Sequence, residues 1–205
     1  MRLVVVAGVI TLVGGALAQL VSSIVWPVLP GQPTDATLET MRQHLPAARL
    51  GLWVDLGILL LIPAGLFVGK ALGSQTRTAV AVGTGLLFLG CLLQVPPLAG
   101  DVVLVQAAEA NDIAAVDGFF GSAPMTISLF GGLLLQLAGL VVLGIQVIRR
   151  RVASVWIGAL LIAWPILQFL GTATAVKPLV TGAYVLQLLA YAGCAGSLAT
   201  RRTQP

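Results

Sequence analysis

Charge is scarce in this sequence. Only 9% of its 205 residues are Asp, Glu, Lys or Arg, whereas 58% are hydrophobic. An average soluble domain carries roughly 25% charged residues. A water-soluble fold of this length could not hide so much apolar surface. The composition therefore excludes an ordinary soluble domain and indicates a protein surrounded by membrane lipid.

Residues that bind metals or haem are almost absent. His44 is the only histidine, and the two cysteines, Cys91 and Cys194, both lie inside apolar runs, where a structural disulfide has no use. No nucleophile elbow, HExxH sequence or phosphate loop occurs, and no predicted span carries two carboxylates. The sequence predicts no cofactor and no metal site, and it favours a non-enzymatic protein.

The basic residues lack the arrangement that nucleic-acid-binding proteins need. The eleven cations give a net charge of +4, but they form no basic stripe interleaved with aromatic residues. We therefore expect no nucleic-acid partner. Most of the cations gather in a few short connections, which is a signal of membrane topology.

Six long apolar runs account for most of the chain. A bilayer core of ~30 Å requires roughly 20 apolar residues in a helix, and a helix satisfies its own backbone hydrogen bonds, as lipid requires. We predict a single all-α domain, 1–205, folded as a polytopic transmembrane helical bundle. Its six spans are 3–26, 51–69, 78–98, 125–148, 152–172 and 179–200.

Charges in the connections predict the orientation of the spans. One alternate set of connections holds eight cations and no acid: Arg2, Lys70, Arg77, Arg149, Arg150, Arg151, Arg201 and Arg202. The positive-inside rule places this set, and with it both termini, on the cytoplasmic side of a cell (plasma) membrane. The outer loops are then 27–50 and 99–124, which hold every acid except Asp55.

The N-terminal segment leaves a second topology open. Residues Met1 to Ala18 have the basic start, the apolar middle and the small-residue end of a signal peptide. The apolar run nevertheless continues to Trp26, which favours an uncleaved span. Cleavage would remove the first span and leave the N-terminus outside.

The two outer loops have helical patterns of their own. In the first, a helix start at Thr34 is followed by Leu38, Met41 and Leu45, which form one apolar stripe. This pattern predicts a short helix lying on the outer surface. The second loop is expected to be partly helical between 101 and 122. The loops either cap the outer mouth of the bundle or, as the simpler interpretation, line the membrane surface as padding.

Six strongly polar side chains, taken one from each predicted span, are candidates for a site. Asp55, in the second span, is the only acid there, and a charge inside a membrane usually faces a polar interior. The others are Gln19, Gln94, Gln136, Gln168 and Gln187. All but Gln136, which lies near the middle, fall in the outer half of the bilayer. We hypothesise that they share an outward-opening pocket, which Trp164 and Tyr184 also line.

Simpler interpretations exist for the same residues. Each glutamine can make a separate hydrogen bond between helices, and such bonds contribute ~0.6 kcal/mol on average. Asp55 can lie near the interface and pair with Arg49, six residues earlier. Trp53 and Phe169 are further candidates for the pocket lining, although Trp53 near a helix end also fits an aromatic belt.

Proline and glycine predict how the helices bend and pack. Kinks are expected in three spans, at Pro63, Pro96-Pro97 and Pro165. A ridge of small residues lets helices approach closely: Gly65, Gly69 and Gly73. Such a ridge packs inside the bundle or forms a dimer, and the oligomeric state stays open.

Three local features of the chain occur together. They are the loop from Pro30-Gly31 to Arg49-Leu50-Gly51, the following span with Asp55-Leu56-Gly57, and a fourth span that runs into a basic turn, Gly139 to Arg151. In these features the chain resembles an uncharacterised family of small bacterial six-span integral membrane proteins. The resemblance would cover most of the chain and implies membrane residence, but no activity.

The sequence favours a binding role without identifying a ligand. We expect a small, partly apolar, lipophilic ligand in the outer-half pocket, with Asp55 supplying charge or accepting a proton and the glutamines orienting the ligand. Membrane lipid is the surrounding partner, and an accessory role beside another membrane protein also fits. The alternatives are a small-molecule or proton-coupled transporter and a membrane enzyme acting on lipid or isoprenoid. The enzyme needs a second acid or base near Asp55.

Overall fold

The computed structural model describes residues 2–28, 32–72, 77–151 and 154–200, and within these ranges it contains helices and turns but no strands. This confirms the all-helical prediction. The first elements are α1 (Arg2–Val9), the π-helix η1 (Ile10–Gly14), α2 (Gly15–Val25), α3 (Thr34–Gln43), α4 (Leu45–Ile58), the 3₁₀ turn η2 (Leu59–Leu61) and α5 (Ala64–Leu72). They are followed by α6 (Arg77–Leu93), α7 (Val95–Ala110), α8 (Ile113–Phe120), α9 (Ala123–Arg150), α10 (Val155–Ala173) and α11 (Lys177–Thr200).

Several of the described helical segments are long and apolar enough to cross a membrane. Five qualify outright: Leu3–Val25, Thr78–Ala110, Ala123–Arg149, Val155–Ala173 and Lys177–Thr200. A sixth candidate is a bent pair, Thr34–Gln43 with Leu45–Leu61, whose axes meet at 98°. The predicted span 51–69 falls on α4, η2 and α5. The described chain thus has five to six candidate spans, as a polytopic membrane protein requires.

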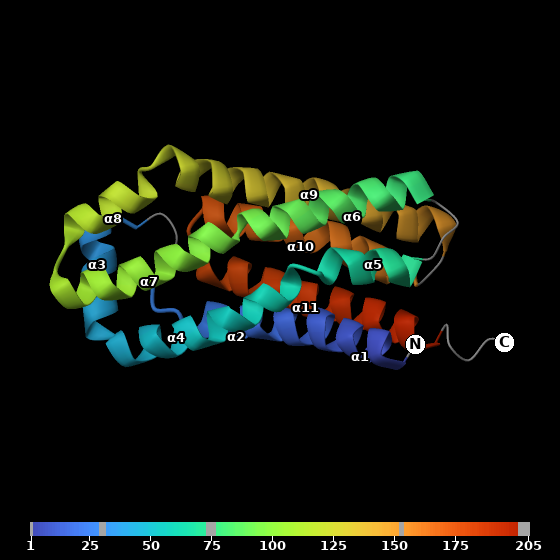
Figure 1. The fold of residues 1–205 in the computed structure, drawn as a ribbon, viewed down its shortest axis with the longest axis horizontal. Coiled ribbons are helices and arrows are strands. Elements are labelled where there is room, and N and C mark those ends of the chain that lie inside the picture. Colours follow the sequence, from blue (N-terminus) through green and yellow to red (C-terminus); the bar gives the residue numbers. More distant parts are fainter. Residues whose placement is uncertain (1, 29–31, 73–76, 152–153, 201–205) are drawn as a thin grey trace.

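The long helices pack side by side as a closed ring (Figure 1). In this ring α2 packs against α4, α5 against α6, α6 against α9, α9 against α10, and α10 against α11, which returns to α2. A large apolar cluster, here called the bundle core, fills the ring. At the end where α1 begins and α11 ends, its members include Leu12, Val68, Leu143, Val147 and Leu198.

Two helix breaks lie toward the opposite end of the ring. α4 ends in the turn η2, because Pro63 has no N–H to continue the hydrogen-bond ladder, and α5 begins at Ala64. Gln94 separates α6 from α7, and a proline lies in the first turn of α7, where a missing N–H has no cost. These breaks coincide with two of the three predicted kinks, whereas Pro165 lies inside α10 without ending it.

The segment formed by α6 and α7 is longer than a membrane requires. Thr78–Ala110 has 33 residues, or ~50 Å at 1.5 Å per residue, against a hydrocarbon core of ~30 Å. α7 therefore extends beyond the ring and reaches α3 and α8 (Figure 1). The helical segment continues beyond the predicted third span, 78–98, through residues expected to form an outer loop.

A second apolar cluster joins α3, α7 and α8 at this far end. Leu38 and Met41 of α3 are buried in one cluster with Leu104 and Ala108 of α7 and Val116 of α8. The short helix predicted in the first outer loop therefore exists, but its apolar stripe faces α7 instead of the membrane surface. We call α3, α8, the far half of α7 and the first turns of α4 the cap. The packing of these loops on one another fits a cap over the end of the bundle better than padding spread along the membrane surface.

Polar contacts fasten the cap around its apolar cluster. Arg49 of α4 pairs with Glu109 of α7, with Nη2 2.7 Å from Oε1. Arg42 Nε donates to the carbonyl oxygen of Ala108 at 3.0 Å. Exposed ion pairs contribute only ~0–1 kcal/mol, so burial of the apolar cluster is the main stabilising term of the cap.

Glycines set the closest approach between helices. Gly83 on α6 faces Gly139 on α9, and a Cβ on Gly139 would lie 2.7 Å from the Gly83 oxygen and 2.6 Å from the Leu87 nitrogen. In the predicted ridge, Gly65 and Gly69 face α6 inside the bundle. Gly73 lies outside the described residues, as do Arg201 and Arg202. The described part of the ridge therefore packs within the molecule.

We expect Gly139→Ala to lower the melting temperature of the detergent-solubilised protein, because the added methyl group meets backbone atoms of α6. Overpacking of this kind costs roughly 1–3 kcal/mol. The matched control is Gly85→Ala, where a Cβ meets nothing within 4 Å. Replacing a glycine inside a helix with alanine should here raise the free energy of unfolding by roughly 0.5–1 kcal/mol. Thermal unfolding followed by circular dichroism compares the two. Equal melting temperatures would contradict the close approach of α6 and α9.

Candidate functional site

A cavity of about 300 Å³ lies between the bundle core and the cap. Its lining includes Leu61, Leu87 and Trp164 of the bundle core, together with Val28 and Phe120 of the cap cluster. Residues beside both helix breaks contribute to this lining, among them Leu59 and Ile62 around η2 and Gln94 at the start of α7. The volume is at the lower end of the roughly 300–1,000 Å³ typical of small-molecule sites.

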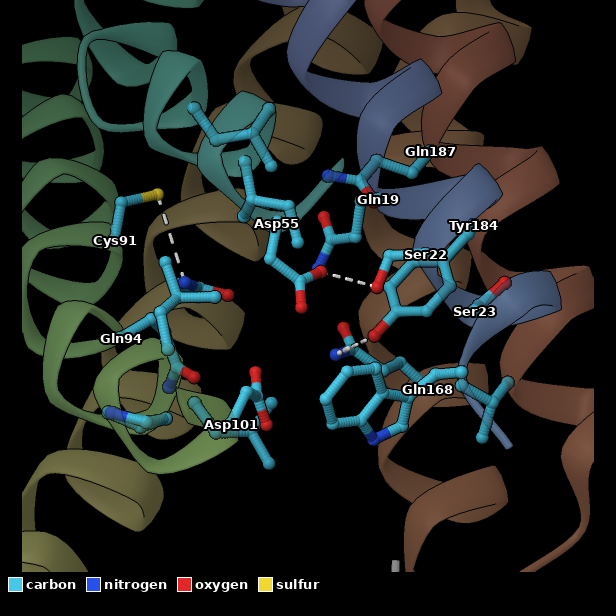
Figure 2. A pocket seen from close by; sticks show the side chains of 18 of the residues that line it. Gln19, Ser22, Ser23, Asp55, Cys91, Gln94, Asp101, Gln168, Tyr184 and Gln187 are labelled. Carbon is cyan, nitrogen blue, oxygen red and sulfur yellow. Dashed lines mark hydrogen bonds between the residues drawn. The ribbon is translucent and has the colours of Figure 1, made fainter. Parts of the chain in front are cut away.

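All eight side chains that the sequence suggested for a pocket line this one cavity. They are Gln19, Asp55, Gln94, Gln136, Trp164, Gln168, Tyr184 and Gln187. Figure 2 shows polar groups facing the space from opposite walls, with Gln94 on one side and Tyr184 and Gln168 on the other. The structure thus brings together residues from six helical segments of the ring.

Helical spacing explains how further polar residues join the lining. On α2, Gln19, Ser22 and Ser23 lie at i, i+3 and i+4, and Trp26, just after α2, continues the stripe at i+7. The same intervals recur around the start of α7, at Gln94, Pro97, Leu98 and Asp101. Neither serine nor Asp101 was predicted as a site residue. Their helical register relative to the glutamines is the signal that could have identified them.

Asp55 is buried at the centre of the cavity wall. It is 5% exposed, and its Oδ1 accepts a hydrogen bond from Ser22 Oγ at 2.5 Å, which links α4 to α2. Arg49 pairs with Glu109 and makes no ion pair with Asp55. The interpretation of Asp55 as an interfacial partner of Arg49 is therefore wrong, and the carboxylate faces the cavity.

Asp101 supplies a second carboxylate to the same space. The sequence placed it in an outer loop, but it lies on the second turn of α7 and lines the cavity. Figure 2 shows Asp55 and Asp101 facing the space from different helices. Within the described residues Asp101 has neither a hydrogen bond nor an ion pair.

Four polar atoms of the lining are buried without a hydrogen-bond partner. Three are acceptors, Gln19 Oε1, Gln168 Oε1 and Gln187 Oε1, and one is the indole donor Nε1 of Trp164. Gln187 is 1% exposed and Trp164 is 2% exposed. An unsatisfied buried polar group costs roughly 1–3 kcal/mol, so water or a ligand in the cavity would stabilise this arrangement.

Some of the glutamines also connect helices, as the simpler interpretation expected. Gln168 Nε2 donates to Tyr184 Oη at 3.1 Å and joins α10 to α11. Gln94 Nε2 donates to the carbonyl oxygen of Leu129 at 3.2 Å and joins the start of α7 to α9. Each bond uses only the amide nitrogen, so interhelical packing and a polar cavity coexist here.

Other candidates lie away from the cavity. Trp53 is 74% exposed and Phe169 is 44% exposed, and neither contributes to the lining. Cys91 lines the cavity, whereas Cys194 is buried in the bundle core. Among the described residues, no group of three or more His, Cys, Asp or Glu side chains could hold a metal ion.

Comparison of the chain with protein-family models, with curated proteins and with solved structures found no match. The resemblance to small bacterial six-span proteins therefore stays a prediction. The geometry of the cavity is the basis on which a function can be argued.

We expect Gln187→Leu to raise the melting temperature of the ligand-free protein, because it removes a buried acceptor that has no partner. The matched comparison is Gln94→Leu, which breaks the bond to the Leu129 carbonyl and should not stabilise the protein. Differential scanning fluorimetry in one detergent measures both. A fall in melting temperature for Gln187→Leu would contradict the prediction that Oε1 is unsatisfied.

Proposed function

We propose that this protein is an integral membrane protein that binds a small, partly apolar molecule in the cavity between its bundle core and its cap. The observation that carries this proposal is the gathering of unpartnered polar atoms and two carboxylates in one space of about 300 Å³. Groups of this kind are costly in a membrane unless they meet water, a ligand or one another.

The roles of the lining follow from its chemistry. Asp55 and Asp101 provide charge or accept a proton, and the free amide oxygens orient polar groups of the ligand. Trp164 and Tyr184 each contribute an apolar ring together with one polar group, an indole N–H or a phenol O–H, and this combination is common in small-molecule sites.

In this proposal the cap faces outside and the cavity opens on the outer half of a plasma membrane. Exposed cations at the other end of the bundle, Lys70, Arg149 and Arg151, support this orientation through the positive-inside rule. The cap carries exposed acids, among them Asp112 and Asp117.

A membrane enzyme acting on a lipid or isoprenoid is the second candidate. It is favoured by Asp101, because acid–base chemistry beside Asp55 needs a second titratable group. A transporter receives less support. The bundle core fills the end of the ring opposite the cap largely with apolar side chains such as Leu12, Leu143 and Val147.

The test is native mass spectrometry of the full chain extracted gently from its own membrane. We expect a small molecule to be retained by the wild-type protein and lost from Asp55→Asn, because this substitution removes the buried acidic group. The matched control is Asp35→Asn, which changes an exposed carboxylate of the cap and should leave the molecule bound.

The possible outcomes separate the candidates. A bare protein in both wild type and control would contradict the binding role, and a stoichiometric protein partner would favour an accessory subunit. The retained molecule can then be added back to the purified protein. Its conversion by the wild type, with loss of this conversion in Asp101→Asn, would favour the enzyme.

A further inference from the structure

We propose that the ligand of this cavity is an organic amine, a cationic N–H donor attached to an apolar body, held between Asp55 and Asp101. This inference rests on the proposed binding function and adds the chemical class of the ligand. It is carried by three properties of the lining: its charge, its excess of free acceptors and its aromatic walls.

The charge of the cavity is the first argument. Asp55 and Asp101 both line it, and the ion pairs among the described residues involve neither of them. One cation, Lys177, also lines the cavity, but its Nζ donates to the carbonyl oxygens of Trp26 at 2.9 Å and Ile24 at 3.5 Å and forms an ion pair with neither carboxylate. The two carboxylates therefore lack a counter-ion that a bound cation would supply.

The second argument is the balance of free donors and acceptors. Among the buried lining atoms without a partner in the described part of the chain, three are glutamine oxygens and one is a donor, Trp164 Nε1. Asp55 accepts one bond, from Ser22, and Asp101 accepts none. A ligand that matches this lining must donate several hydrogen bonds, which favours a primary or secondary ammonium over a quaternary one and excludes an anion.

The walls of the cavity give the third argument. Trp26, Phe120, Trp164, Tyr184 and Tyr191 all line it, and Trp164 and Tyr191 pack edge to face with their ring centroids 6.4 Å apart. Aromatic faces attract cations and also bury apolar groups. An inorganic cation would leave this aromatic surface unused, whereas an amine with an aromatic or aliphatic body would bury it.

The positions of the carboxylates locate the amine. Asp55 lies deep, beside Ser22 and on the bundle side, whereas Asp101 lies on α7, the helix that continues into the cap. Figure 2 shows both carboxylates bordering one open space. An ammonium between them would tie α4 to α7 just beyond the two helix breaks, so binding should stiffen the end of the bundle that carries the cap.

The experiment uses the full chain in lipid nanodiscs and three probes of similar shape and different charge: 2-phenylethylamine, 2-phenylethanol and 3-phenylpropanoate. Isothermal titration calorimetry measures affinity, and thermal shift measures stabilisation. We expect saturable binding of the amine and at least roughly tenfold weaker binding of the alcohol and the carboxylate, because charge-assisted hydrogen bonds are the strong ones.

Variants assign the binding to the two carboxylates. Asp101→Asn should weaken amine binding roughly 10- to 100-fold without loss of folding, since Asp101 has no hydrogen-bond or ion-pair partner in the described part of the chain. Asp55→Asn should weaken it similarly and keeps an Oδ1 that can accept from Ser22 Oγ, and its melting temperature checks that the fold is preserved. The control Asp35→Asn should bind the amine as the wild type does.

The results that would overturn the inference differ from those that would overturn the proposed function. Equal affinity for the alcohol and the amine would contradict the proposal that the ligand is an amine, but would still support a binding cavity. Saturable stabilisation by sodium chloride without competition from the amine would assign the site to an inorganic cation. If no probe binds, the amine class is rejected, and the molecule retained in native mass spectrometry still decides the proposed function.

Discussion

Polar groups inside a bilayer have no water to satisfy them, and this constraint governs the arrangement of the whole bundle. Where the helices run unbroken, their backbones are satisfied internally and the ring closes on an apolar core. At Pro63 and Gln94 the ladder is interrupted, and the cavity lies beside these breaks. Its lining contains the glutamines, the serines and both carboxylates. The helix breaks and the polar side chains therefore occur together, at the cavity.

The cap depends on the same two segments. α4 and α7 leave the ring at their breaks, continue outward, and bury α3 and α8 in a second apolar cluster. The cavity is bounded by this cluster on one side and by the bundle core on the other. A change in the angle of α7 would move Asp101 and Phe120 together, since Phe120 packs against the same cluster. The position of the cap and the shape of the cavity are thus coupled through packing, without a mobile lid.

Much of the bundle could be predicted from the sequence, because apolar runs and isolated amides are local signals. The helical class, the short helix after Pro33 and the polar residues that line one cavity all follow from such signals. The extent of α7 did not follow. Pro96 and Pro97 were interpreted as a kink near the end of a span, although prolines fit the first turn of a new helix. Asp101 was therefore assigned to a loop, and the pairing of Arg49 with Glu109 depends on the tertiary fold alone.

The energetics of the lining distinguish a binding site from packing. Gln168 and Gln94 each make one interhelical bond, and a purely structural amide needs no more. Among the described residues, Gln187 Oε1 and the indole N–H of Trp164 have no hydrogen-bond partner, although both side chains are almost fully buried. An apolar residue at either position would fold at lower cost. Groups that lower folding stability while facing one shared space are expected where a protein has kept them for a ligand.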